Sequence, residues 1–147
     1  MSKIISFKGQ LDMGLQDKIN LSTLKGKIGY KINQFKIMQN RPGQITATHI
    51  AKIYNKFQSS FSSVVDFTEG DLLAVAYQGD NASTNYAIHE VIIFDNEITN
   101  QDMYVSITDP DGGTEPCNYY LELEAFPISD IESTKLTLKA LRNVASR

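Results

Sequence analysis

The 147-residue chain is poor in the residues that most catalytic and metal-binding sites use. It has one cysteine, Cys117, which excludes an intrachain disulfide and a zinc site built from several cysteines. Its two histidines, His49 and His89, lie in separate apolar runs, and it has no tryptophan. We therefore expect no enzymatic activity, no cofactor and no bound metal, and we assign no catalytic, cofactor-binding or metal-binding residue.

Charge and hydrophobicity exclude further classes. The chain carries 14 basic and 17 acidic residues, a net charge of -3, which argues against a partner made of nucleic acid. No apolar run approaches the roughly 20 residues that cross a bilayer. Lys8 and Gly9 stand where a signal peptide would have its apolar core. We expect a protein that folds in a cytosol and has no membrane partner.

Short runs of β-branched and aromatic residues dominate, and clusters of glycine, asparagine, aspartate, proline or serine separate them. They predict strands at Lys3–Phe7, Ile28–Met38, Ile45–Phe57, Leu72–Tyr77, Ala87–Phe94, Met103–Thr108 and Cys117–Phe126. The crossover helices of a parallel sheet are missing between them. The pattern predicts an all-β protein, an antiparallel β-sandwich of jelly-roll-like form. It does not separate a jelly roll from an immunoglobulin-like sandwich, because strand order is not written in periodicity.

Local signals refine this prediction. Asn33 is a polar gap on the apolar face of the strand Ile28–Met38, which indicates a bulge. After Pro127 the spacing of the apolar residues favours one short C-terminal helix, capped by Ser129 or Ser133. A strand is the alternative for the same residues. The predicted core comprises Ile28, Tyr30, Ile32, Phe35, Ile37, Leu73, Val75, Ile93, Met103, Val105, Tyr119, Leu121 and Leu123.

The domain organisation follows from these runs. Residues 26–147 form a single β-sandwich domain, because a chain of this length is most simply one domain. Residues 1–25 form either an N-terminal arm or the first strands. An arm could extend onto a neighbouring molecule, in which case deletion of Met1–Gln10 would leave the sandwich folded.

Three groups of polar residues could carry chemistry, and each has a simpler explanation. His49 and His89 could be a metal pair or a general base, but single polar positions in half-buried strands are commoner. Oxygen ligands for calcium could come from Asp95, Asn96, Glu97, Asp109, Asp111 and Glu115. Such clusters more often form turns. Glu122 and Glu124 share a strand face with Tyr120, which fits a solvated or interface-facing surface better than a glycosidase site.

The remaining residues of interest fit a core or an interface. Cys117 is expected to be a small buried hydrophobe. The numerous tyrosines suit protein interfaces, where ring and hydroxyl meet apolar and wet surroundings, and they suit sandwich cores equally well.

Several segments resemble small proteins of marine tailed bacteriophages. They are Lys27–Ile32 with Phe35, Met38 and Pro42-Gly43, Leu72–Ala76, Ile93–Ile98, Asn100–Val105, Cys117–Glu124 and Leu141–Asn143. The resemblance covers about Lys27 to Asn143 and implies a virion structural protein, most simply a capsid decoration (cement) protein. It implies binding to the major capsid protein, a homo-oligomer such as a trimer, and a place on the capsid surface after assembly in the host cytoplasm. The alternative is a carbohydrate- or receptor-binding sandwich of a head fibre or tail, which the lack of tryptophan weakens.

Overall fold

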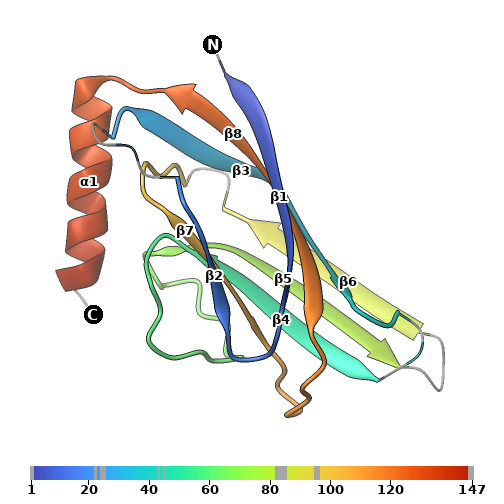
Figure 1. Cartoon of the computed structure of the whole chain (residues 1–147). Coiled ribbons are helices and arrows are strands. Elements are labelled where there is room, and N and C mark those ends of the chain that lie inside the picture. The colour runs from blue at the N-terminus through green and yellow to red at the C-terminus, as the bar shows by residue number, and fades with distance from the viewer. Residues whose placement is uncertain are drawn as a thin grey trace.

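The computed structural model describes residues 2–21, 23, 26–42, 44, 46–81, 86–94 and 97–145. These residues form eight strands and one helix: β1 (Lys3–Leu11), β2 (Gln16–Ile19), β3 (Ile28–Gln39), β4 (Ala47–Tyr54), β5 (Leu72–Asn81), β6 (Tyr86–Ile93), β7 (Met103–Thr108), β8 (Cys117–Pro127) and α1 (Asp130–Ala145). The strands make two antiparallel sheets that pack face to face, and α1 stands at one end of them (Figure 1). The predicted all-β sandwich with one C-terminal helix is confirmed.

The strand order identifies the winding of the sandwich. One sheet has the order β1-β8-β3 and the other the order β2-β7-β4-β5-β6. An eight-stranded jelly roll pairs strand 1 with 8, 2 with 7, 3 with 6 and 4 with 5 as its chain winds. Three of these pairs are present, but β6 pairs with β5 instead of β3. Both β3 and β6 are therefore left as sheet edges on the same side of the sandwich.

The core lies between the two sheets and matches the sequence pattern closely. Eleven of the thirteen residues predicted to be buried are buried, among them Phe35, Leu121 and Leu123. Ile28 and Ile93 are half-buried and pack against the core from its margin. Alternation along β3 is interrupted at the predicted place: Ile32 pairs with Leu123 and Gln34 with Glu122, so Asn33 is the extra residue of a bulge.

The first residues of the chain belong to the sandwich. β1 pairs with β8 at nine positions, and β2 pairs with β7 at four. Leu11, Ile19 and Leu21 are buried in the common core. The described residues up to Leu21 thus form first strands, one at the edge of each sheet.

The described side chains of α1 make polar contacts with the rest of the chain. Ser129 Oγ accepts a hydrogen bond from the backbone N–H of Glu132 (3.2 Å), so Ser129 caps the helix and Ser133 lies within it. Asn100, which is fully buried, donates to the carbonyl oxygen of Gly26 (3.0 Å) and to Thr137 Oγ1 (3.3 Å). Asn100 therefore ties α1 to the chain that leads into β3.

β1 needs a glycine at position 9, because the side chain of Tyr119 lies close to the backbone there. A Cβ at this position would lie 2.8 Å from the hydroxyl oxygen and 2.9 Å from two ring carbons of Tyr119, which pairs with Gly9 on β8. Tyr119 cannot move freely, because its hydroxyl donates a 2.7 Å hydrogen bond to Asp17 Oδ2 on β2. We predict that Gly9→Ala lowers the free energy of unfolding by about 1–3 kcal/mol, measured by urea denaturation. An unchanged denaturation midpoint would show that the ring relaxes at no cost.

Candidate interaction surface

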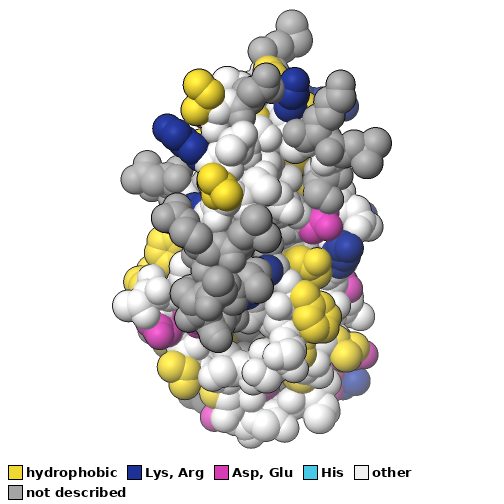
Figure 2. Space-filling view, turned by 90° about the vertical axis from the view of Figure 1, so that its left-hand side faces the viewer, with side chains coloured by type: hydrophobic (Ala, Val, Ile, Leu, Met, Phe, Trp, Pro, Cys, Tyr) yellow, Lys and Arg dark blue, Asp and Glu magenta, His cyan; other side chains and the backbone are white. Residues whose placement is uncertain are grey.

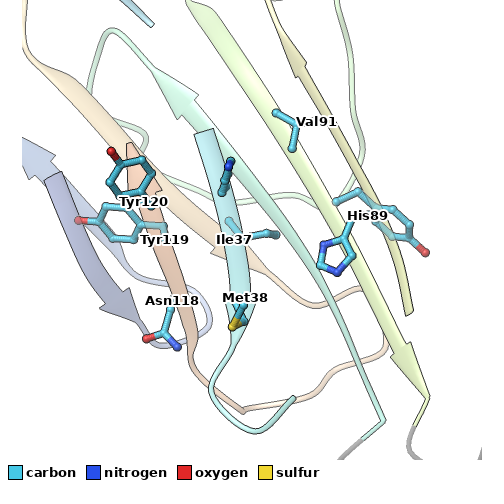
Figure 3. Close-up of a pocket in the computed structure, with 9 residues that line it drawn as sticks. Ile37, Met38, His89, Val91, Asn118, Tyr119 and Tyr120 are labelled. Atoms are coloured by element: carbon cyan, nitrogen blue, oxygen red, sulfur yellow. The ribbon is translucent and has the colours of Figure 1, made fainter. Parts of the chain in front are cut away.

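A large hollow lies between the edge strands β3 and β6. It has a volume of about 540 Å³ and is lined by Lys36, Ile37, Met38, Tyr77, His89, Val91, Asn118, Tyr119 and Tyr120. Figure 3 shows Met38 and the two tyrosines on the side of β3 and β8, with His89 and Val91 opposite them. We call it the β3–β6 hollow.

The strand pairing explains why this hollow is open and apolar. On β6, Val91 pairs with Ala76 and His89 with Gln78, both of which are buried, so Val91 and His89 face the interior side of their sheet. The three-stranded sheet ends at β3 and does not cover them. Met38 is 56% exposed, Val91 41% and Tyr120 36%. Lys36 is the one lysine, arginine or acidic residue of the lining.

A second apolar surface comes from the connection between β4 and β5. This connection, residues 55–71, is attached to the outer face of the five-stranded sheet. Phe57, Val64, Val65 and Phe67 are 64%, 71%, 42% and 54% exposed. We call these four side chains the loop patch. Hydrophobic side chains are visible on the lower part of the molecular face that carries α1 (Figure 2), where this connection runs (Figure 1).

The loop patch is held in place at several points. Lys52 of β4 is buried beneath the connection, and its Nζ donates to the carbonyl oxygen of Val64. Gln16 Nε2 donates to the carbonyl oxygen of Gln58 (3.0 Å), while the Gln58 N–H donates to Gln16 Oε1 (3.3 Å). Both aromatic residues of the patch make edge-to-face contacts, Phe57 with Tyr104 of β7 (6.2 Å between centroids) and Phe67 with Phe94, which directly follows β6 (5.0 Å). The exposed apolar side chains therefore sit on a fixed backbone.

Lys52 is the residue that the sequence analysis missed. Burial lowers the pKa of its ammonium group, an effect that the negative charges of Glu69 and Asp66 oppose. The available signal was a lysine between Ile50 and Tyr54, which share its strand face. Apolar residues on both sides of Lys52 on one strand face indicate that this face is buried. The connection between β4 and β5 covers it.

The two histidines are not neighbours. His49 pairs with Gln78 of β5, and Gln78 pairs with His89 of β6, so a glutamine lies between them in the sheet. His49 is fully buried, and its Nε2 lies 3.2 Å from the carbonyl oxygen of Glu115, to which it donates. His89 is exposed and lines the β3–β6 hollow.

The acidic candidates lie in turns or pair with basic residues. Asp109 Oδ1 accepts the N–H of Asp111 (2.7 Å), and the Asp109 carbonyl accepts the N–H of Gly112 (3.1 Å), which has a φ of +80°. This is the geometry of a turn. Glu97 binds Lys139 Nζ at 2.6 Å. Asp95 and Asn96 lie outside the described residues, and within the described ones no three histidine, cysteine or acidic side chains converge on a metal-sized site.

Glu122 and Glu124 lie with Tyr120 on the outer face of the three-stranded sheet. In the strand register Glu124 is opposite Lys31, while Tyr120 lies between Lys36 on β3 and Lys8 on β1. The two carboxylates are half-buried among these neighbours. The face is therefore one of mixed charge, as expected for a polar surface.

Cys117 and the tyrosines take different positions. Cys117 is fully buried in the core, and this burial raises the pKa of its thiol to about 12. Tyr30 and Tyr119 are also buried, and burial raises the pKa of both phenols. Tyr120 is the exposed one beside the β3–β6 hollow.

Comparison with known proteins adds no relative. No protein-family model matches the chain, and no curated protein is significantly similar to it. Within the ranges that the structure covers, no helix has the length and apolar character needed to span a bilayer.

Proposed function

We propose that this protein is a capsid decoration protein of a tailed bacteriophage. Many copies bind the outer surface of the head, contact the major capsid protein and stabilise the shell. The observation that carries the proposal is the loop patch, four large apolar side chains exposed on a fixed connection. A surface of this kind suits a protein that is buried against a permanent partner.

The resemblance to phage proteins supports the same proposal from the sequence. Its segments correspond to the framework of the sandwich, since Lys27–Ile32 leads into β3, Leu72–Ala76 lies in β5 and Cys117–Glu124 lies in β8. The loop patch is outside these segments. In this proposal a common framework presents a contact surface that is particular to one capsid.

The anchoring of the loop patch favours binding. Association costs free energy when mobile side chains and loops become ordered, and a loop already attached to its sheet avoids part of that cost. Burying one large apolar side chain completely contributes about 1.5–3 kcal/mol. Four half-exposed side chains would together contribute several kcal/mol per copy, and an extended shell multiplies the effect over many copies.

We predict that Val64→Asp and Phe57→Asp each weaken particle binding at least about tenfold, because a buried carboxylate would replace an apolar contact. Purified variants are mixed with capsids of the parent phage that lack the protein, and bound copies are counted after sedimentation. Ile131→Asp on α1 is the matched control, since Ile131 is 69% exposed and is not one of the four residues of the patch. If all three variants bound as well as the wild-type protein, the loop patch would not be the surface that contacts the capsid.

A further inference from the structure

The structure has four sheet edges, and they differ in how they are protected from pairing. Exposed edges usually carry lysines, a bulge or a very short strand, which prevent the addition of another strand. β1 has Lys3 and Lys8, β2 is four residues long, and β3 has Lys31, Lys36 and the bulge at Asn33. Among the described edge strands, β6 has no lysine and no bulge and is not unusually short, and Glu90 is its one acidic side chain.

β6 exposes apolar side chains on both of its faces, beside His89 and Glu90. Its sequence, Tyr-Ala-Ile-His-Glu-Val-Ile-Ile, contains no lysine or proline, and its pairing with β5 runs without a register shift. Ile88 and Ile92 are 45% and 37% exposed on the outer face, and Val91 is 41% exposed on the inner face. A free edge of this kind, eight residues long, without a bulge and largely apolar, is a template for pairing.

Each face of β6 adjoins an apolar hollow. On the inner side is the β3–β6 hollow. On the outer side is a smaller one of about 180 Å³, lined by Val65, Phe67, Val75, Tyr77, Glu90 and Ile92. A strand added to the free edge would place alternate side chains toward the two hollows.

We propose that the β6 edge binds the β6 edge of a second copy of this chain. The two strands pair antiparallel across a twofold axis, so that the two five-stranded sheets become one continuous sheet. The inference goes beyond the capsid proposal and does not depend on it.

The exposed apolar area around β6 is comparable with the apolar part of a standard dimer interface. Ile88, Val91, Ile92, Met38 and Tyr120 are 45%, 41%, 37%, 56% and 36% exposed and together present roughly 400 Å². Because about 57% of a typical interface is non-polar, this corresponds to roughly 700 Å² per partner, close to the about 800 Å² of a standard interface.

The charges of β6 determine the register. In an antiparallel pair on a twofold axis one residue lies opposite its own copy. A register centred on Glu90 would oppose two carboxylates, which is unfavourable. Registers centred on His89 or Val91 place Glu90 opposite Ile88 or Ile92 of the second copy. The charge disfavours a register centred on Glu90, and we place the axis at one of its two neighbours, His89 or Val91.

The test is the mass of the purified protein in solution, measured by analytical ultracentrifugation over a range of concentrations. We expect a dimer, and Val91→Lys should weaken self-association at least about tenfold. Ile4→Lys is the matched control, because Ile4 is 54% exposed on the edge strand β1. Circular dichroism establishes that each variant is folded. A folded wild-type monomer, or a trimer, would overturn the proposal, and so would a Val91→Lys variant that remains dimeric.

Cross-linking tests the register directly. Val91→Cys or His89→Cys should form a disulfide-linked dimer under mild oxidation, since opposed residues of paired strands lie about 4.5–5.5 Å apart. The native Cys117 is fully buried and does not interfere. Ile4→Cys should stay monomeric on a denaturing gel. If neither β6 cysteine cross-links, β6 does not pair with its own copy in either proposed register, and a strand of another protein becomes the candidate occupant. Capsid binding by the loop patch is measured separately and can survive that outcome.

Discussion

Deletion of Met1–Gln10 is expected to destabilise the whole sandwich, contrary to the behaviour of a free N-terminal arm. The deletion removes all of β1 except Leu11, and with it Ile5 and Phe7, which are partly buried and pack against the core. Complete burial of two such side chains would contribute about 3–6 kcal/mol, so these two contribute a part of that, in addition to the backbone pairing with β8. A domain of this size has about 5–15 kcal/mol of stability in total. We therefore expect an aggregated product or a greatly lowered denaturation midpoint.

Urea denaturation followed by circular dichroism measures this effect. Two point variants on β1 keep the backbone pairing of the strand. They compare a side chain that packs against the core with one that is exposed. Phe7→Ser should lose much of the stability, whereas Ile4→Ser should change it by less than about 0.5 kcal/mol, because Ile4 is exposed. A truncated protein with the wild-type midpoint would contradict the structure and restore the arm interpretation.

The second large effect is expected at alkaline pH. Burial raises the pKa of Cys117 from its ordinary 9.0 to about 12. The unfolded chain therefore releases the thiol proton first, and the free energy of unfolding falls as the pH rises from about 9 to 12. Each pH unit in this window costs up to about 1.4 kcal/mol. Cys117→Ala should make the decline shallower by that amount.

Other groups titrate in the same pH range, so the effect of the thiol is measured by comparing the wild-type protein with Cys117→Ala. Burial of Tyr30 and Tyr119 raises their pKa values and adds to the loss of stability above about pH 10. The lowered pKa of Lys52 acts in the opposite direction, because the unfolded chain then binds the extra proton. Urea denaturation of both proteins at several values from about pH 8 to 10.5 isolates the thiol. If the free energy of unfolding fell equally with pH in both proteins, the pKa of Cys117 would not be raised in the native state.

Periodicity predicted the parts of the fold that depend on one strand at a time. Alternation from Ile28 to Met38, with its gap at Asn33, was enough to place a strand and its bulge. The strand Met103–Thr108 has the predicted limits. The pattern after Pro127 indicated a helix, and Ser129 caps it.

The pairing of strands that lie far apart in the chain could not be predicted from the sequence. Nothing in the run Tyr86–Ile93 shows that it pairs with β5 and leaves β3 free, yet this choice creates the β3–β6 hollow. The N-terminal residues could be an arm or strands because their alternation is the same in both cases. The polar beginning of the connection after Phe57 gave no sign that Val64 and Phe67 lie on the outer face of a sheet. Contacts between distant residues decide all three.

The central proposal, that this is a decoration protein of a phage head, is tested most directly by a reconstruction of purified particles. We predict density for the sandwich at repeated positions on the outer surface of the shell, in many copies arranged by the capsid symmetry. The loop patch should face the major capsid protein. Purified particles that contain no copy of this chain would contradict the account.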